Sequence, residues 1–299
     1  MKNLLFTGAS GFVGANIKPI LSISYRYRTV GITEMDDYKV NLSVKVPDLK
    51  NRYNIVLHAA GKAHMVSTTE AEKKVFFDIN LQGTKNLCYA LEKAGTPESF
   101  IYISTVAVYG LESGESITEE YPLNGSNPYA LSKILAEEYL KEWCISHNVK
   151  LGILRSSLMA GKNPPGNLGA MINGIKSGKY LRIGDGSARK SILMAEDIAR
   201  LIPKLTEVGG IYNVCDNNHP SFKELEELIS KQLDIKDPKS IPYGIAKSLA
   251  IVGDVFGNKF PINSNKLNKI TKSLTFSNEK AKRELDWEPM DVLKNFIIN

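Results

Sequence analysis

The sequence predicts an α/β fold, with a doubly wound parallel sheet of the Rossmann type and a smaller C-terminal α/β domain. Short apolar segments suited to buried strands alternate with longer segments of helical periodicity, the order expected of a parallel sheet. A glycine-rich turn joins the first strand to the first helix. After Ser156 the composition shifts towards loops and shorter elements. We therefore place the domains at residues 1–158 and 159–299, with a strand near 211–214 returning to the main sheet.

The composition is that of an ordinary globular chain, since 43% of the 299 residues are hydrophobic and 23% are charged. The net charge of +6 is mild and its lysines and arginines are spread along the chain, so no nucleic-acid binding is predicted. No stretch approaches the ~20 apolar residues of a membrane span. Cys88, Cys144 and Cys215 are far apart and lack metal-ligand spacing, which favours a reducing cytoplasm.

The first turn has the glycine spacing of a dinucleotide site. Asn3–Thr7 reads as a buried strand, and helical periodicity begins directly after the turn. Glycines three apart allow a tight bend, close backbone approach to a phosphate, and close packing of helix on strand. The helix N-terminus adds partial positive charge. The residues expected to hold the diphosphate are Gly8, Gly11, Phe12, Val13 and Gly14.

A second strand, Arg28–Glu34, ends in an acid about 20 residues beyond the turn, where such folds place a carboxylate on the adenosine ribose. Glu34 would repel a 2′-phosphate, so NAD is favoured over NADP. The alternative is a solvated loop acid. Asn41 is a candidate contact to the adenine, or a turn residue.

The third strand, Asn54–His58, is followed by small residues that leave room for a ligand at the carboxyl end of the sheet: Ala59, Ala60 and Gly61. His58 is expected to be structural rather than catalytic. Lys62 and His64, in the loop that follows, are weaker candidates to border the nicotinamide.

A long helix is predicted from Glu72 to Glu92. Asn80 and the pair Gly83-Thr84 conflict with local helix propensity, and such conflicts often mark functional sites. The fourth strand, Ser99–Thr105, ends in two hydroxyls, Ser104 and Thr105, at the catalytic edge of the sheet, and Ser104 is a candidate contact to the cofactor.

A tyrosine followed four residues later by lysine occurs at three places: Tyr89/Lys93, Tyr129/Lys133 and Tyr243/Lys247. This spacing puts both side chains on one helical face, where the ammonium lowers the pKa of the phenol and makes it a usable acid or base. Only Tyr129 follows a strand that ends in paired hydroxyls. We therefore assign Tyr129 and Lys133 to proton transfer, with Thr105 holding the substrate oxygen.

The second half of the chain has a fifth apolar strand at Lys150–Arg155, a strand at Ile211–Val214 and an amphipathic helix at 222–233. The segment Ile245–Phe256 is mostly apolar and of helical length. We expect a packed helix there. Attachment to a membrane surface is the alternative, which sparse cationic flanks disfavour.

With these residues placed, the sequence resembles the extended short-chain dehydrogenase/reductase family, in the branch that acts on nucleotide-diphosphate sugars. The motifs that carry the resemblance cover nearly the whole chain. They are the TGASGFVG turn, His58-Ala-Ala, Asn80 with Gly83-Thr84, Ser104-Thr105 leading to Val108-Tyr109-Gly110, Tyr129/Lys133, Gly184–Lys190 before Glu196-Asp197, and Leu285–Pro289.

The resemblance implies bound NAD(P), a second domain that grips the sugar nucleotide, and a homodimer. It implies a catalytic trio of Thr105, Tyr129 and Lys133, with Asn80 on the nicotinamide side. The residues expected to bind the substrate's diphosphate and nucleoside are Asn167, Arg189 and Lys190.

Departures from the family pattern narrow the reaction. The 4,6-dehydratases carry Asp-Glu after the threonine, but here Val106 and Ala107 cannot transfer protons. Arg155–Leu158 lacks the asparagine usual in UDP-galactose 4-epimerases, and the stretch after it is more similar to enzymes of 4-keto-6-deoxy-hexosamine nucleotides. We expect a 4-keto reductase of surface-polysaccharide synthesis. The alternatives are a 4-epimerase with tightly bound NAD and a non-catalytic dinucleotide sensor.

Overall fold

The structure is a computed structural model and describes residues 1–63, 65, 67–256 and 262–298, so His64 lies outside it. Its centre is a seven-stranded sheet in the order β11-β7-β5-β4-β1-β2-β3, in which every neighbouring pair is parallel. The strands are β1 (Asn3–Thr7), β2 (Arg26–Gly31), β3 (Tyr38–Lys39), β4 (Ile55–His58), β5 (Ser99–Thr105), β7 (Lys150–Ser156) and β11 (Gly210–Val214).

The strand order reverses at β1. From β1 the chain first builds outward through β2 and β3, then crosses to β4 on the other side and continues to β5, β7 and β11. The connections that leave β1 and β4 therefore diverge, and a crevice forms at their carboxyl ends, where open parallel sheets bind ligands. The predicted return of residues 211–214 to the main sheet is confirmed by the pairing of β11 with β7.

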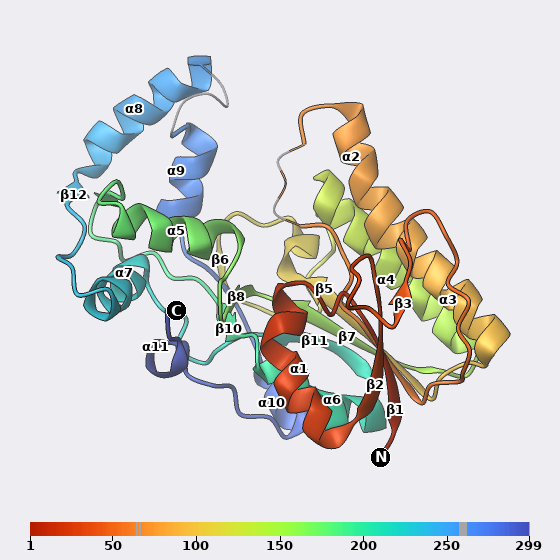
Figure 1. The fold of residues 1–299 in the computed structure, drawn as a ribbon. Helices are drawn as coiled ribbons and strands as arrows, with labels where there is room; N and C mark the ends of the chain where they lie inside the picture. The colour runs from red at the N-terminus through yellow and green to blue at the C-terminus, as the bar shows by residue number, and fades with distance from the viewer. Residues whose placement is uncertain (64, 66, 257–261, 299) are drawn as a thin grey trace.

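Helices cover both faces of this sheet (Figure 1). Alternate residues of β1 enter different cores, because Leu4 and Phe6 belong to one cluster of buried residues and Leu5 to the other. The first cluster is covered by α1 (Phe12–Ser24), α6 (Asp197–Val208) and α10 (Glu279–Leu285), and the second by α3 (Gly83–Ala94) and α4 (Pro128–Ser146).

The helix predicted at 72–92 has three parts. It begins as α2 (Glu70–Phe77), passes through a π-helical turn, η1 (Asp78–Gln82), and continues as α3. A capping box starts it, because Thr69 and Glu72 satisfy each other's backbone N–H groups. The π turn falls on Asn80, the residue whose polarity conflicted with a buried helix, and such turns occur often at functional sites.

Most of the remaining chain forms a smaller region beside the carboxyl edge, seen at the left of Figure 1. Its core contains residues of α5, α7, β10 and α11. Besides β11, α6 and α10 from the second half of the chain pack on the main sheet. The elements not yet given are η2 (Val106–Tyr109), β6 (Gly114–Ile117), β8 (Leu158–Ala160), α5 (Gly166–Lys176), β9 (Arg182–Ile183), β10 (Ile192–Met194), α7 (Phe222–Gln232), β12 (Ser240–Ile241), α8 (Tyr243–Phe256), α9 (Ser264–Thr271), β13 (Leu274–Phe276) and α11 (Val292–Asn295).

A buried polar network fastens α4 to the sheet. The carboxylate of Glu137 accepts bonds from the Ser104 hydroxyl at 2.5 Å and from Arg155 Nη2 at 2.7 Å. Arg155 Nη1 donates to the Tyr109 hydroxyl at 3.1 Å, and that hydroxyl donates to Asn213 at 2.7 Å. All five residues are buried. The network therefore joins α4, η2, β5, β7 and β11 directly under the carboxyl edge.

Replacing Glu137 should be strongly destabilising. Glu137→Ala leaves the buried guanidinium of Arg155 unpaired, and we expect the free energy of unfolding to fall by about 3–5 kcal/mol. Glu138→Ala, at the next and exposed position of α4, is the matched control and should change it by about 0.5 kcal/mol or less. Urea unfolding followed by circular dichroism measures both, and equal effects would contradict the assigned role.

Candidate functional site

The turn between β1 and α1 depends on two of its glycines. Gly8 has φ +76°, and a Cβ there would lie 2.5 Å from the backbone nitrogen of Ala60. A Cβ on Gly14 would lie 2.2 Å from the carbonyl oxygen of Ala9. Any side chain at Gly8 would push the turn away from the end of β4, and any at Gly14 would push α1 off the turn. The two loops that flank the crevice meet because these side chains are absent.

This turn fits a diphosphate. Gly11 is the N-cap of α1, and no side chain caps the helix. Gly11 is exposed, and Phe12 and Val13 are half-buried, so the first backbone N–H groups of α1 lie at the surface of the crevice. Uncapped N–H groups at the positive end of a helix are a ready site for phosphate oxygens.

Ala59, Ala60 and Gly61 follow β4 and line the same edge. The backbone N–H of Ala60 donates to the Thr7 hydroxyl at 3.2 Å, which ties this loop to β1. A Cβ on Gly61 would lie 3.0 Å from Asn80 Oδ1 and 3.3 Å from Lys133 Nζ. The small residues therefore let Asn80 from η1 and Lys133 from α4 approach the loop.

Asn80 uses its amide to connect two parts of the site. Its oxygen accepts from the backbone N–H of Lys62 at 2.7 Å, and its nitrogen donates to the Lys62 carbonyl at 3.1 Å. The same nitrogen donates to the Ser132 hydroxyl at 2.9 Å, and Ser132 donates to the carbonyl of Tyr129 at 2.8 Å. The loop after β4 is thus joined to the first turn of α4.

Tyr129 and Thr105 meet at the carboxyl edge of the sheet. A hydrogen-bonding interaction with Thr105 lowers the pKa of the Tyr129 phenol, but burial is the larger effect and raises it above 10 overall. The phenol ring of Tyr129, which is half-buried, also lies 6.0 Å from the ring of Phe76. The expectation that Lys133 lowers this pKa is wrong for the structure described, because Lys133 makes other contacts.

Lys133 points into the sheet. Its ammonium donates to the carbonyl of Ile103 at 2.9 Å and lies 4.5 Å from the centre of the Tyr102 ring. Burial lowers the pKa of Lys133 to about 8, although attraction to Glu137 opposes the shift. The lysine is therefore mostly protonated at neutral pH, directly behind the edge where Tyr129 and Thr105 meet.

Two residues expected on the adenosine side make local contacts. Strand β2 ends at Gly31 rather than at Glu34, because Asp36 folds back on Thr33 in a turn. Glu34 is exposed and forms an ion pair with Lys39. The side-chain oxygen of Asn41 accepts from the N–H and hydroxyl of Ser43, which makes it a turn residue as well as a candidate contact.

The three residues expected to bind substrate lie in the smaller region. Asn167 is exposed at the N-terminus of α5. Arg189 donates to the His219 carbonyl and pairs with Glu224 at 3.3 Å. Lys190 donates to the carbonyl of Lys272 at 2.8 Å, and its burial lowers its pKa to about 8. Among the described residues, no hydrogen bond or ion pair connects Asn167 with Arg189 or Lys190. Ser104, which was expected to contact the cofactor, donates its hydroxyl to Glu137 instead.

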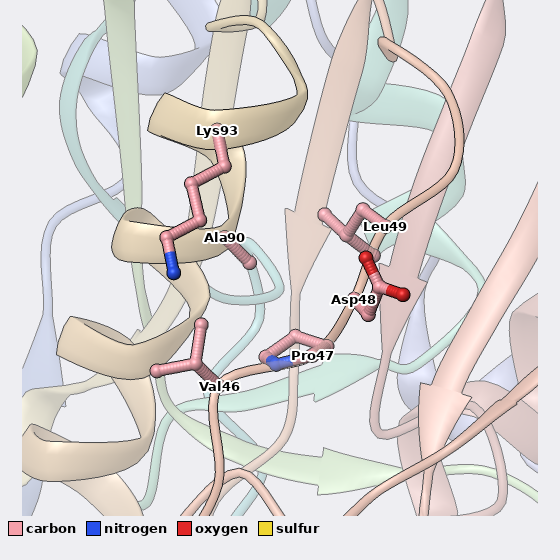
Figure 2. A pocket seen from close by; sticks show the side chains of 6 residues that line it. All are labelled: Val46, Pro47, Asp48, Leu49, Ala90 and Lys93. Atoms are coloured by element: carbon pink, nitrogen blue, oxygen red, sulfur yellow. The ribbon is translucent and has the colours of Figure 1, made fainter.

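A separate pocket of about 330 Å³ holds none of these residues (Figure 2). Ala90 and Lys93, which line it, belong to the last turns of α3, whereas Asn80 precedes the first turn of that helix. The pocket therefore lies at the opposite end of α3 from the candidate site. Its other lining residues are Val46, Pro47, Asp48 and Leu49.

Comparison with known proteins assigns the chain to a family. Residues 4–215, which contain the glycine turn, Asn80, Thr105, Tyr129 and Lys133, match the NAD dependent epimerase/dehydratase family. The chain belongs to this family. The resemblance drawn from the motifs is confirmed, and the protein is an NAD(P)-dependent enzyme of the nucleotide-sugar epimerase and reductase group.

Relatives in this family act on different substrates. The chain is 28% identical to the N-acetyl-alpha-D-glucosaminyl-diphospho-ditrans,octacis-undecaprenol 4-epimerase of Escherichia coli O157:H7, over 93% of this chain and 88% of that protein. It is also 28% identical to the GDP-6-deoxy-D-mannose reductase of Pseudomonas aeruginosa, over 77% of this chain and 79% of that protein.

Solved structures share the fold. The structure of RMD from Pseudomonas aeruginosa complexed with NADPH has a TM-score of 0.72 at 23% identity, over 99% of this chain and 96% of that chain. UDP-glucose 4-epimerase from Thermotoga maritima with UDP-glucose has a TM-score of 0.75 at 20% identity, over 98% and 96%. They confirm the predicted Rossmann-type architecture. Within the described ranges, no helix is long and apolar enough to cross a bilayer.

Three residues that shape the site were not predicted from the sequence. Ser132 links Asn80 to Tyr129, Phe76 packs its ring near that of Tyr129, and Glu137 holds Ser104 and Arg155. Glu137 stands four positions after Lys133 on the buried face of α4, where most of the other residues are apolar. An acid at that spacing was the available signal that the lysine has a buried partner.

His58 is the structural residue that the sequence predicted. Its Nδ1 lies 2.5 Å from the Thr7 hydroxyl and its Nε2 lies 2.9 Å from the Thr84 hydroxyl, which in turn donates to the Asn80 carbonyl at 2.6 Å. Burial, and then the nearby charge of Lys133, lower the pKa of His58 to about 3. The imidazole is therefore neutral in the folded enzyme, and it supports the position of Asn80.

This buried histidine should make stability depend on pH. A folded-state pKa of about 3 against about 6.5 when unfolded means that the stabilisation is present above pH 6.5 and lost as the pH falls. From pH 6.5 to pH 5 we expect the wild type to lose about 1.5 kcal/mol more than His58→Asn does. Urea titrations at several pH values measure this difference in slope, and parallel curves would contradict the assignment.

Proposed function

We propose that the enzyme reduces the 4-keto group of a nucleotide-diphosphate sugar in the synthesis of surface polysaccharide. The observation that supports this is the meeting of the Tyr129 phenol with Thr105 at the carboxyl edge, beside a turn that fits a diphosphate. The next two positions, Val106 and Ala107, offer no acid or base for dehydration. A positioned phenol with no second proton-transfer pair suits carbonyl reduction.

The chain supplies a complete set of groups for the cofactor. Bound NAD(P)H supplies the hydride that reaches C4. The turn would hold the diphosphate through backbone N–H groups of Phe12, Val13 and Gly14. Gly11, whose own N–H donates to the Gly8 carbonyl at 3.0 Å, would let the phosphate approach the backbone, and Gly8 allows the approach of Ala59–Gly61. Asn80 would keep the loop after β4 in place on the nicotinamide side. Glu34 would bind the adenosine ribose and favour NAD.

Tyr129 would donate the proton. Because burial raises its pKa above 10, the phenol carries its proton at neutral pH and can release it to the C4 oxygen as negative charge develops there. Thr105 would orient that oxygen. Lys133 keeps a positive charge behind the edge, where it stabilises the developing anion.

The smaller region would bind the rest of the substrate. Lys190 is partly desolvated and lies near the positive charge of Lys269, and both effects lower its pKa. The negative charge of a diphosphate beside Lys190 would stabilise the protonated lysine and oppose the lowering of its pKa. Arg189 would add a second cation. Asn167, at the uncapped start of α5, would bind the nucleoside.

The second candidate is 4-epimerisation, in which one enzyme-bound NAD takes and returns the hydride. The epimerase from Escherichia coli O157:H7 supports it, since it is as similar to this chain as the reductase from Pseudomonas aeruginosa. The same trio would serve, with Tyr129 accepting a proton before donating it. A non-catalytic sensor is disfavoured by the retained tyrosine and lysine.

We further propose a homodimer in the cytoplasm, a compartment that suits three free and buried cysteines.

Replacing one phenol tests the proton donor. Tyr129→Phe should lower kcat by about 10²–10⁴-fold, because the variant keeps the ring but has no proton to donate. Cofactor affinity, measured by fluorescence titration with NADH, should stay within about twofold. Tyr89→Phe is the matched control, because Tyr89 stands in the same sequence pattern but is exposed on α3. A fully active Tyr129→Phe enzyme would remove Tyr129 from the mechanism.

Cofactor stoichiometry separates the two reactions. For a reductase we expect the oxidation of one NADH per 4-keto sugar nucleotide consumed, with NADH preferred over NADPH. Glu34→Gln should narrow that preference, because it removes the charge that repels a 2′-phosphate. Mass spectrometry of copurified ligands and absorbance at the NADH band measure these outcomes. Interconversion of two C4 epimers with copurified NAD and no added cofactor would instead establish the epimerase.

A further inference from the structure

Helix α8 exposes an apolar face. The helix packs on the molecule through its small residues, because Ala246 and Ala250 are fully buried in a cluster with Leu267 of α9. The larger apolar side chains point outward, and Val255 is 83% exposed. The sequence predicted a packed helix here, but the packed side is made of alanines. The outward residues are Ile245, Leu249, Ile251, Val252 and Val255.

These five residues form one stripe. At 100° per residue, Ile251, Val252 and Val255 fall on the side of the helix opposite Ala246, Ala250 and Gly253, which are buried, and Ile245 and Leu249 lie on the flank between the two sides. From Ile245 to Val255, at a rise of 1.5 Å per residue, the stripe runs along about 15 Å of surface. An exposed apolar face of this kind, on a helix whose described buried residues are small, is typical of a helix that lies in a membrane interface.

The segment of sequence that contains this stripe carries most of the net charge of the chain. Residues 236–272 contain seven lysines and two aspartates, a net charge of +5 out of +6 for the whole chain. The lysines are not adjacent in the sequence, so the flanks of Ile245–Phe256 contain few cations although the longer segment is strongly positive. The carboxylate of Asp254, one of the two acids, accepts hydrogen bonds from the backbone N–H and the hydroxyl of Ser264 at the start of α9. Lys247 on α8 and Lys269 on α9 are exposed.

Charge decides which partner suits the stripe. A second copy of the chain placed there would bring two segments of net charge +5 together, and like charges at an interface are costly. An anionic lipid surface offers the opposite charge to the lysines and an apolar layer to the stripe.

We propose that α8 and α9 dock the enzyme on an anionic bilayer, with the outward side chains of α8 inserted at the acyl boundary and the lysines among the headgroups. The proposal is independent of the reaction at Tyr129. It adds a place of action, the surface of a membrane, to an enzyme whose described helices do not cross one.

Vesicle flotation of the full chain tests the proposal. We expect the protein to float with vesicles of phosphatidylglycerol and phosphatidylethanolamine, to stay behind with phosphatidylcholine alone, and to be released by salt. The double variant Ile251→Ser/Val255→Ser should weaken binding about tenfold or more. Lys247→Glu/Lys269→Glu should weaken it to a similar extent.

The matched control is Ile23→Ser/Val44→Ser, which makes the same exchanges at exposed positions outside α8 and should bind like the wild type. Three results would overturn the proposal. They are no flotation with anionic vesicles at low salt, equal flotation with both vesicle types, and a dimer that the α8 variants dissociate while vesicle binding is unchanged. Light scattering coupled to gel filtration measures the last of these.

Discussion

The site is held together by the amide of one buried side chain. Asn80 satisfies both backbone groups of Lys62 and, through Ser132, the first turn of α4, so it sets the distance between the loop after β4 and the helix that carries Tyr129. Its position rests on Thr84 and the neutral His58 below it. A charged or longer side chain at residue 80 could not make these three bonds at once.

Local patterns predicted the frame of this site well. The glycine turn and the strands Ser99–Thr105 and Ile55–His58 depend on residues close in the sequence, and they lie where expected. The conflict at Asn80 was visible because a polar residue stood where helix periodicity required an apolar one. The π turn at this position was not visible in the sequence, and neither were the contacts of Asn80 with Lys62 and Ser132, because both partners are distant in the sequence.

The expectations that failed concern the surroundings of a side chain. The i, i+4 spacing puts Tyr129 and Lys133 on one face, but it does not show that Ile103 and the ring of Tyr102 draw the ammonium into the sheet. Burial therefore outweighs the expected effect of the lysine on the tyrosine pKa. Similarly, the periodicity of α8 predicted a helix but not that its alanines would form the packed side.

All three cysteines are enclosed by the layers of the fold: Cys88 and Cys144 lie between the sheet and helices α3 and α4, and Cys215 lies just beyond β11. Burial raises the pKa of each thiol, to about 12 for Cys144 and Cys215. Reaction with a thiol reagent needs the thiolate and therefore needs these layers to separate. The rate of such labelling would report how often the native protein opens, with no engineered residue.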